Sequence, residues 1–150
     1  MTDSVSDIIL TQQQIVDEFS RLEEWEDRYG RIIELGKRLP ALEELPEDAR
    51  DEKFRVRGCQ STVFLKPELR EGKIFFQATS DAMIVRGLIA LLLRVYSGRT
   101  PDEIIRTPPE FIDKIGLSRN LSQGRASGLS AMIEQIKLYA VAFKTLQGRM

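Results

Sequence analysis

Cys59 is the side chain with the clearest capacity for covalent chemistry, and it is the only cysteine among the 150 residues. It lies in the run Gly58-Cys59-Gln60-Ser61, where the small and polar residues of a turn interrupt a strand-like pattern. A lone cysteine is more often an inert buried hydrophobe than a reactive group. Functional groups concentrate on loops that a rigid scaffold holds, so a strand-to-strand turn favours a reactive thiol.

Two arginines, Arg55 and Arg57, precede this turn. In an extended segment, side chains two residues apart point to the same face, so both could act on the thiol together. A nearby guanidinium favours the thiolate, which is the nucleophilic form of cysteine. The alternative is that both are ordinary solvent-facing strand residues, and the sequence leaves the two possibilities open.

The residue types that the sequence lacks narrow the chemistry further. Without histidine, neither a Ser-His-Asp triad nor a Cys-His pair can form. One cysteine cannot resolve its own disulfide, and without histidine it cannot build a Cys/His zinc site or a cysteine-ligated cluster within one chain. Neither common glycine-rich nucleotide-binding loop occurs. We therefore expect exchange chemistry with a sulfur held by another protein, and no metal, tightly bound cofactor or self-contained active site.

Charge and hydropathy limit the partners and the location. The net charge of -1 gives no general electrostatic case for nucleic acid or an anionic membrane as partner. The longest apolar run, residues 87–93, is far too short to span a bilayer. The N-terminus carries acid where a secretion signal needs base, and a single cysteine cannot form an internal disulfide. The acidic N-terminus and the single cysteine predict a cytoplasmic protein. We expect the protein to be a monomer or a weak homodimer.

The elements that must position the cysteine can be predicted from capping and periodicity. Thr11 with Gln14 resembles a capping box and predicts that the first helix begins there. A break near Gly30 separates it from a second helix, which Pro40 ends. Residues 40–53 then form an acidic loop, either a solvated connector or an edge that meets a basic partner.

The second half of the pattern predicts a sheet followed by helices. Alternating apolar residues predict three strands in an antiparallel meander, over residues 54–57, 62–65 and 73–79, with a turn over residues 67–72. Helices follow over residues 82–96, 109–115 and 125–147. Another helix begins at Thr100-Pro101-Asp102-Glu103, which offers a capping residue, a proline at the first helical position and an acid at the third. We therefore expect one α+β domain over residues 1–150: N-terminal helices, then a three-stranded antiparallel sheet covered by helices. The first ten residues are too polar and unpatterned to join the core firmly, and we expect residues 1–10 to be flexible.

Three stretches in the same order resemble the SufE family of sulfur-acceptor proteins. The family's acceptor-cysteine motif, V-x-G-C-Q-S-x-V, matches residues 56–63. Its S-D-A-x-I-V-K-G-L stretch resembles residues 80–88, and its L-S/T-P-x-R-x-x-G-L stretch resembles residues 121–129. The resemblance covers about residues 12 to 145, and several motifs in register are more specific than any one of them.

The resemblance implies a mechanism and a fold. A SufS-type cysteine desulfurase, which contains pyridoxal phosphate, would pass persulfide sulfur to Cys59 and be stimulated by this transfer. The chain would then deliver the sulfur to a scaffold for iron–sulfur cluster assembly, and the pyridoxal phosphate would stay with the partner. By motif position, Asp81 and Arg125 would lie near the cysteine loop or the desulfurase contact, with Arg57, Gly58, Gln60 and Ser61 as its local support. The implied fold is α+β and shared with the NifU/IscU scaffolds.

The sequence also departs from the family pattern and leaves other functions open. Phe54 stands where many members have asparagine, Phe64 where they have tryptophan, and Gln123 where the third stretch has proline. The first alternative function is a sulfur relay to another pathway, such as cofactor or tRNA thiolation. A cluster scaffold is less favoured, because one cysteine per chain offers too few ligands. A non-catalytic interaction domain is the remaining alternative.

Overall fold

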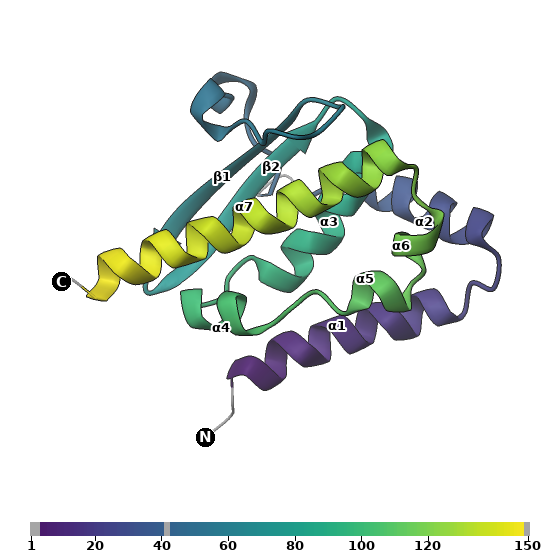
Figure 1. Cartoon of the computed structure of the whole chain (residues 1–150), viewed down its shortest axis with the longest axis horizontal. Coiled ribbons are helices and arrows are strands. Elements are labelled where there is room, and N and C mark those ends of the chain that lie inside the picture. The colour runs from purple at the N-terminus through teal and green to yellow at the C-terminus, as the bar shows by residue number, and fades with distance from the viewer. Residues whose placement is uncertain (1–3, 41–42, 149–150) are drawn as a thin grey trace.

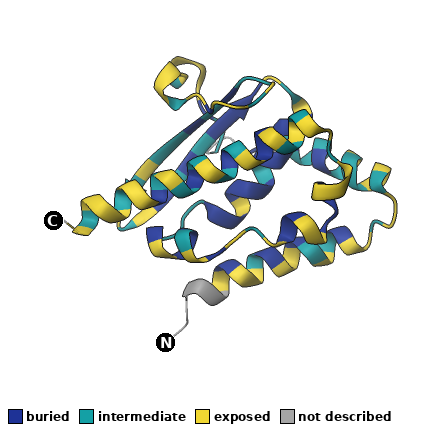
Figure 2. Ribbon diagram, in the orientation of Figure 1, coloured by how far each residue is buried: buried dark blue, intermediate teal, exposed yellow. Residues whose placement is uncertain are grey.

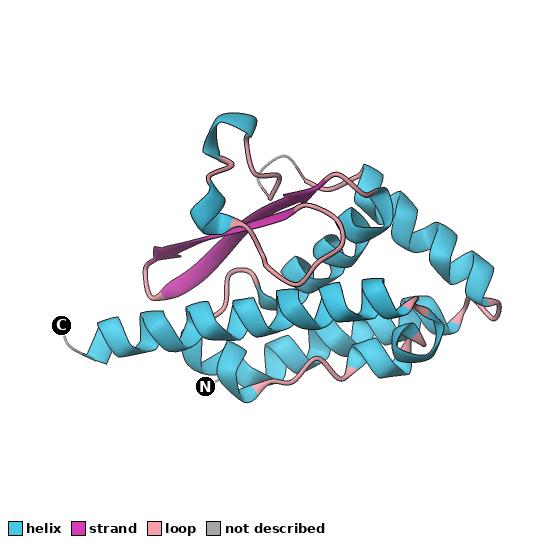
Figure 3. Ribbon diagram, turned by 45° about the horizontal axis from the view of Figure 1, so that its top comes forward, coloured by secondary structure: helices cyan, strands magenta, loops and turns pink. Residues whose placement is uncertain are grey.

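The computed structural model describes residues 4–40 and 43–148. Its elements are α1 (Ser4–Ser20), α2 (Trp25–Lys37), the 3-10 helices η1 (Glu47–Ala49) and η2 (Glu52–Phe54), β1 (Val63–Arg70), β2 (Lys73–Ser80), α3 (Met83–Tyr96), α4 (Pro101–Arg106), α5 (Phe111–Lys114), α6 (Leu117–Asn120) and α7 (Gln123–Gly148). The two strands form a hairpin that lies against a layer of helices (Figure 1, Figure 3). The fold is therefore α+β.

The sheet formed by the described residues has two strands, so the prediction of three is wrong. β1 and β2 pair antiparallel, from Val63 opposite Ser80 to Arg70 opposite Lys73. The predicted strand over residues 54–57 contributes only one isolated bridge, between Arg55 and Phe64.

The segment before the cysteine is too short and too bent to extend the ladder. η2 occupies the chain up to Phe54, and Gly58 turns it with a φ of 92°, a conformation that favours glycine. Between them, one backbone hydrogen bond joins the Val56 N–H to the Val63 carbonyl at 2.8 Å. The alternation along this segment is nevertheless kept, because Val56 is buried and the arginines on either side of it are both exposed.

The hairpin is longer than predicted, since β1 continues through Pro67 to Arg70. Pro67 is tolerated because β1 is an edge strand: a proline there can direct its nitrogen, which has no hydrogen, away from the partner strand. The turn consists of Glu71 and Gly72, with φ values of 52° and 79°. Two left-handed residues in succession match the twist of an antiparallel hairpin.

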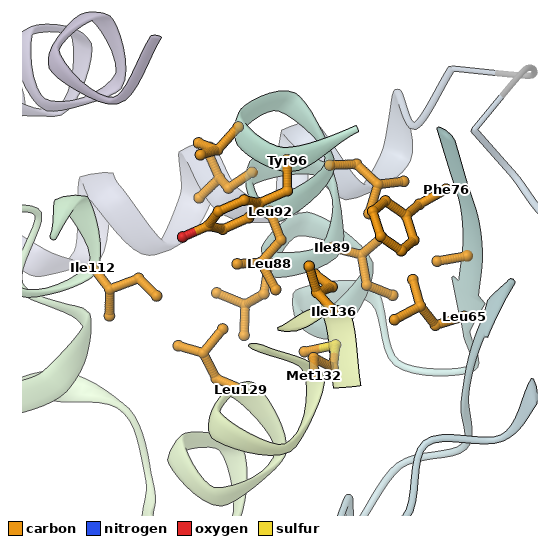
Figure 4. Close-up of a cluster of buried hydrophobic side chains, with 14 of the residues drawn as sticks. Leu65, Phe76, Leu88, Ile89, Leu92, Tyr96, Ile112, Leu129, Met132 and Ile136 are labelled. Carbon is orange, nitrogen blue, oxygen red and sulfur yellow. The ribbon is translucent and has the colours of Figure 1, made fainter. Parts of the chain in front are cut away.

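The central helix is α3, and it agrees with the predicted span to within one residue. Its buried side chains include Leu88, Ile89, Leu92 and Tyr96, which lie on the face shown in Figure 4. These side chains meet the hairpin residues Leu65 and Phe76 and the α7 residues Leu129, Met132 and Ile136 in one hydrophobic cluster (Figure 4). Burial on several sides explains why its sequence is apolar around most of the circumference.

The N-terminal helices differ from their predicted bounds. α1 begins at Ser4, and Thr11 lies inside it, donating its hydroxyl to the Asp7 carbonyl at 3.1 Å. Ile8 is fully buried because it continues the apolar face formed further along by Ile15 and Phe19. The expectation that residues 1–10 stand apart from the core is therefore wrong at Ile8, and residues 1–3 lie outside the described residues. α2 runs through Gly30 without the predicted break, which falls at residues 21–24 instead.

The acidic segment after α2 is partly built into the fold, although residues 41–42 lie outside the described part. Leu45 is fully buried, and its N–H donates to the Ala78 carbonyl at 3.1 Å. The Ala78 N–H donates in turn to the Glu43 carbonyl at 2.8 Å. Glu44 forms an ion pair with Arg86 of α3. These contacts attach the segment to the free edge of β2.

The C-terminal half confirms the capping signals. α4 carries the predicted capping box: Glu103 N–H donates to the Thr100 hydroxyl, and Thr100 N–H donates to the Glu103 carboxylate. α5 and α6 occupy the region of the predicted helix over residues 109–115 and just beyond it. α7 crosses the whole molecule, with buried residues toward the core and exposed ones outward (Figure 2). No helix in the described ranges combines the length and the apolar character needed to cross a membrane.

Candidate functional site

The cysteine loop, residues 57–62, leaves the isolated bridge beside β1 and returns at Val63 to begin that strand. Asp81, just before α3, holds its far end: the Thr62 N–H donates to Asp81 Oδ1 at 3.1 Å. The Asp81 N–H donates back to the Thr62 carbonyl at 3.4 Å. Asp81 therefore lies at the cysteine loop, and its carboxylate accepts a loop hydrogen bond.

Cys59 turns inward from this loop onto α7. Its thiol lies 3.6 Å from the Gly128 carbonyl oxygen, within hydrogen-bonding distance for sulfur. Gly128 is buried beneath the cysteine, and a Cβ added there would lie 3.4 Å from Sγ. The thiol is half-buried, and this burial raises its pKa above the ordinary cysteine value. The resting thiol is therefore protonated at neutral pH and weakly nucleophilic.

A cleft of about 110 Å³ lies beside the thiol. Its lining combines the loop residues Cys59, Gln60 and Ser61 with apolar side chains of α3 and α7, namely Val85, Leu88, Leu129 and Met132. Gly124 and Arg125, from the first turn of α7, and Gly128, one turn further along, complete the lining. The cleft is thus apolar on the core side and polar at its mouth, and it brings together four of the residues that the sequence singled out: Cys59, Gln60, Ser61 and Arg125.

Arg125 is held at this mouth by a contact with α2. Its Nη1 donates to the Tyr29 hydroxyl at 3.1 Å, and its guanidinium lies 6.0 Å from the centre of the Tyr29 ring. Its backbone N–H faces the Ser122 hydroxyl at 3.4 Å, as expected for a helix start. Arg125 is exposed, so its cation faces both the cleft and the solvent.

The side chains of the two arginines upstream of the cysteine point away from this cleft. Arg55 and Arg57 share one face, as expected, but that face lines a groove with Ala131 and Glu134 of α7. Arg55 forms an ion pair with Glu52 at 3.2 Å. Neither arginine lines the cleft of the thiol, and burial is the cause of the shift in the Cys59 pKa. The idea that they favour the thiolate in this conformation is therefore not supported.

The sequence-based set of site residues lacks Tyr29, Gly124 and Gly128. It also lacks the apolar residues that line the cleft, namely Val85, Leu88, Leu129 and Met132. The two glycines are four residues apart in one helix and therefore lie on the same face, one turn apart. Glycine destabilises a helix interior, so its presence there often marks a position where another group packs closely, and this spacing was an available signal for a close contact. Tyr29 offered no comparable signal. Within the described ranges, no three of the Cys, Asp and Glu side chains gather as a group that could hold a metal ion.

Comparison with known proteins identifies the family of this chain. The family model for SufE, the Fe-S metabolism associated domain, matches residues 13–140. The chain belongs to the SufE family. An uncharacterized SufE-like protein of Rhizobium meliloti (strain 1021) is 45% identical over 129 residues, which cover 83% of this chain and 90% of that protein. The sulfur acceptor protein CsdE of Escherichia coli (strain K12) is 37% identical over 129 residues, covering 85% and 86% of the two chains.

A solved structure supports the fold independently. The solution structure of a hypothetical protein from Thermus thermophilus superposes with a TM-score of 0.72. The match covers 90% of this chain and 96% of the other, at 23% sequence identity. The resemblance to SufE that the three sequence stretches indicated is therefore confirmed by the family match, and the arrangement of helices around a small sheet recurs in a solved structure.

Proposed function

We propose that this SufE-family protein is a sulfur acceptor that takes sulfane sulfur from a cysteine desulfurase onto Cys59. The observation that carries the proposal is the position of the only cysteine, on a loop beside a cleft that ends in solvent. The relative named as a sulfur acceptor protein supports it.

The transfer is a thiol–persulfide exchange with no net oxidation. The Cys59 thiolate attacks the outer sulfur of a persulfide on the desulfurase. A new S–S bond forms at Cys59 Sγ, and the S–S bond on the desulfurase breaks. The desulfurase cysteine leaves as a thiolate and takes up the proton that Cys59 has lost.

Activation must come from the partner. The resting thiol is half-buried with a raised pKa, and the sequence contains no histidine that could deprotonate it. A desulfurase that draws the cysteine loop away from α7 returns the thiol to its ordinary pKa and exposes it, so that its thiolate can attack the persulfide. Asp81, which accepts a hydrogen bond from the cysteine loop, and Arg125, which lines the cleft, are proposed to support the loop and the partner.

The fate of the sulfur is the finer part of the proposal. The family description, Fe-S metabolism, favours delivery to a scaffold for iron–sulfur cluster assembly, with stimulation of the desulfurase. The pyridoxal phosphate would belong to the desulfurase. A relay to cofactor or tRNA thiolation uses the same donor chemistry and remains the second candidate.

An intact-mass experiment tests the proposal. The protein is mixed with a SufS-type cysteine desulfurase and free cysteine without reductant, and the chain is then weighed. We expect one or more added sulfur atoms on the wild-type chain and none on Cys59→Ser, together with loss of desulfurase stimulation in the variant. An unmodified wild-type chain, or stimulation that survives in Cys59→Ser, would overturn the acceptor role. A stable cluster formed at stoichiometric yield during anaerobic reconstitution with iron and sulfide would favour a scaffold instead.

A further inference from the structure

The Gln60 side chain lies directly over Gly124 in the first turn of α7. A Cβ built on Gly124 would overlap the terminal amide of Gln60, including its Oε1, Cδ and Nε2 atoms. Real Cβ atoms are essentially never found so close to another heavy atom. The present position of Gln60 therefore requires that residue 124 have no side chain.

Gly124 and Gly128 thus form two adjacent contact positions for the tip of the cysteine loop. Gln60 packs on Gly124, and Cys59 packs on Gly128 one helical turn further along. The two positions differ in whether they have room for a side chain. At Gly128 an added Cβ would reach Sγ at 3.4 Å, an ordinary van der Waals contact, whereas at Gly124 it would displace Gln60.

The contact at Gly128 is a weak anchor on its own. A thiol is a poor hydrogen-bond donor, and its 3.6 Å distance to the carbonyl is long. The bond from Thr62 to Asp81 fixes the end of the cysteine loop, three residues beyond the thiol. Cys59 itself also packs against the hydrophobic core. The packing of the exposed Gln60 amide on the helix surface is a further contact at the tip.

We propose that Gln60, packed on Gly124, is a latch that holds the cysteine loop against α7 and so controls how often Cys59 is available for exchange. Gly124 is the positioning residue of this latch. The biological meaning of the latch rests on the proposed function. Its physical test does not, because the accessibility of the thiol can be measured without any partner.

Alkylation of the thiol provides the test. Gly124→Ala is compared with wild type and with Gly30→Ala, a matched control in α2 where an added Cβ meets nothing within 4 Å. The rate of reaction with iodoacetamide is measured from about pH 6 to about pH 10, a range that brackets the ordinary cysteine pKa. We expect Gly124→Ala to react about fivefold faster at neutral pH, the effect of losing a few dispersion contacts. Its pH profile should shift to lower pH, because the released thiol is no longer desolvated. Gly30→Ala should match wild type.

A second variant shows whether Gln60 mediates the effect. Gln60→Ala should raise the alkylation rate to a similar extent, and adding Gly124→Ala to it should change nothing further. Equal rates for wild type and both single variants, or fully multiplicative effects in the double variant, would overturn the latch. If Gly124→Ala fails to fold, Gln60→Ala on the exposed loop decides the question alone. If the alkylation rates support the latch but Cys59 gains no sulfur, only the proposed function is contradicted. If Cys59 gains sulfur but the alkylation rates do not support the latch, only this inference is contradicted.

Discussion

Gly36 provides a stringent test of how closely α2 and α3 pack beneath the site. A Cβ added at Gly36 would lie 2.5 Å from the Met83 carbonyl oxygen and 2.8 Å from the Gly87 nitrogen. Both are backbone atoms of α3, so no side chain can move aside, and the helices must separate by several tenths of an ångström. Overpacking of this kind typically costs about 1–3 kcal/mol, and we expect a value near the upper end for Gly36→Ala. In a chain of this length, such a loss lowers Tm by roughly 5–10 °C.

Urea denaturation followed by circular dichroism measures this loss, with Gly30→Ala as the matched control. Both glycines lie in α2, but nothing lies within 4 Å of a Cβ added at Gly30. Gly30→Ala should therefore stabilise the protein by about 0.5–1 kcal/mol through helix propensity alone. The two substitutions thus have opposite predicted signs. A urea midpoint for Gly36→Ala equal to or above that of wild type would refute the close packing of α2 on α3.

Two further predictions concern single contacts. Asp81→Ala removes the acceptor for the Thr62 N–H and should loosen the cysteine loop, raising the alkylation rate of its thiol by up to about fivefold; Asp81→Asn, which keeps an acceptor oxygen, should change it less. The Arg94 guanidinium pairs with Glu18 and lowers the pKa of that carboxyl. The pair therefore stabilises the fold above the ordinary glutamate pKa, and this stability is lost as pH falls through the lowered one. Because both side chains are more than a third exposed, Glu18→Gln should cost at most about 0.5 kcal/mol at neutral pH. Urea titrations at about pH 7 and about pH 3 should show this difference shrinking in acid, and a constant difference would contradict the pairing.

Local signals in the sequence predict the helices after the hairpin well, and the N-terminal helices and the sheet less well. The apolar sequence of α3 and the capping box of α4 act within a few residues, so their bounds could be predicted closely. The segment around Val56 alternates as a strand does, yet it makes only one bridge. Alternation reports which face is buried, whereas a ladder also requires several successive residues without a turn, and Gly58 ends the segment too soon.

The candidate site shows the same division between local and long-range information. The position of Cys59 on a loop followed from neighbouring residues. Its contact with Gly128 joins residues 69 positions apart, and no periodicity in either segment specifies it. The contacts of Asp81 with the cysteine loop likewise depend on how α3 follows the hairpin. Only the family motif placed Asp81 and Arg125 near the cysteine, whereas the Tyr29 contact that holds Arg125 needed the folded chain.

Burial of Cys59 has opposing effects on protection and on reactivity. A half-buried, protonated thiol resists oxidation, because oxidants attack the exposed thiolate. Burial also means that the thiol is available for exchange in only a fraction of the molecules at any moment. The apparent affinity of a partner that binds this available form is reduced by the same fraction. Under the proposed function, loosening the Gln60 contact should therefore strengthen desulfurase binding and also speed oxidation of the free protein. In this view, the packing of Gln60 on Gly124 balances the two effects, and a tighter contact would protect the thiol at the expense of sulfur transfer.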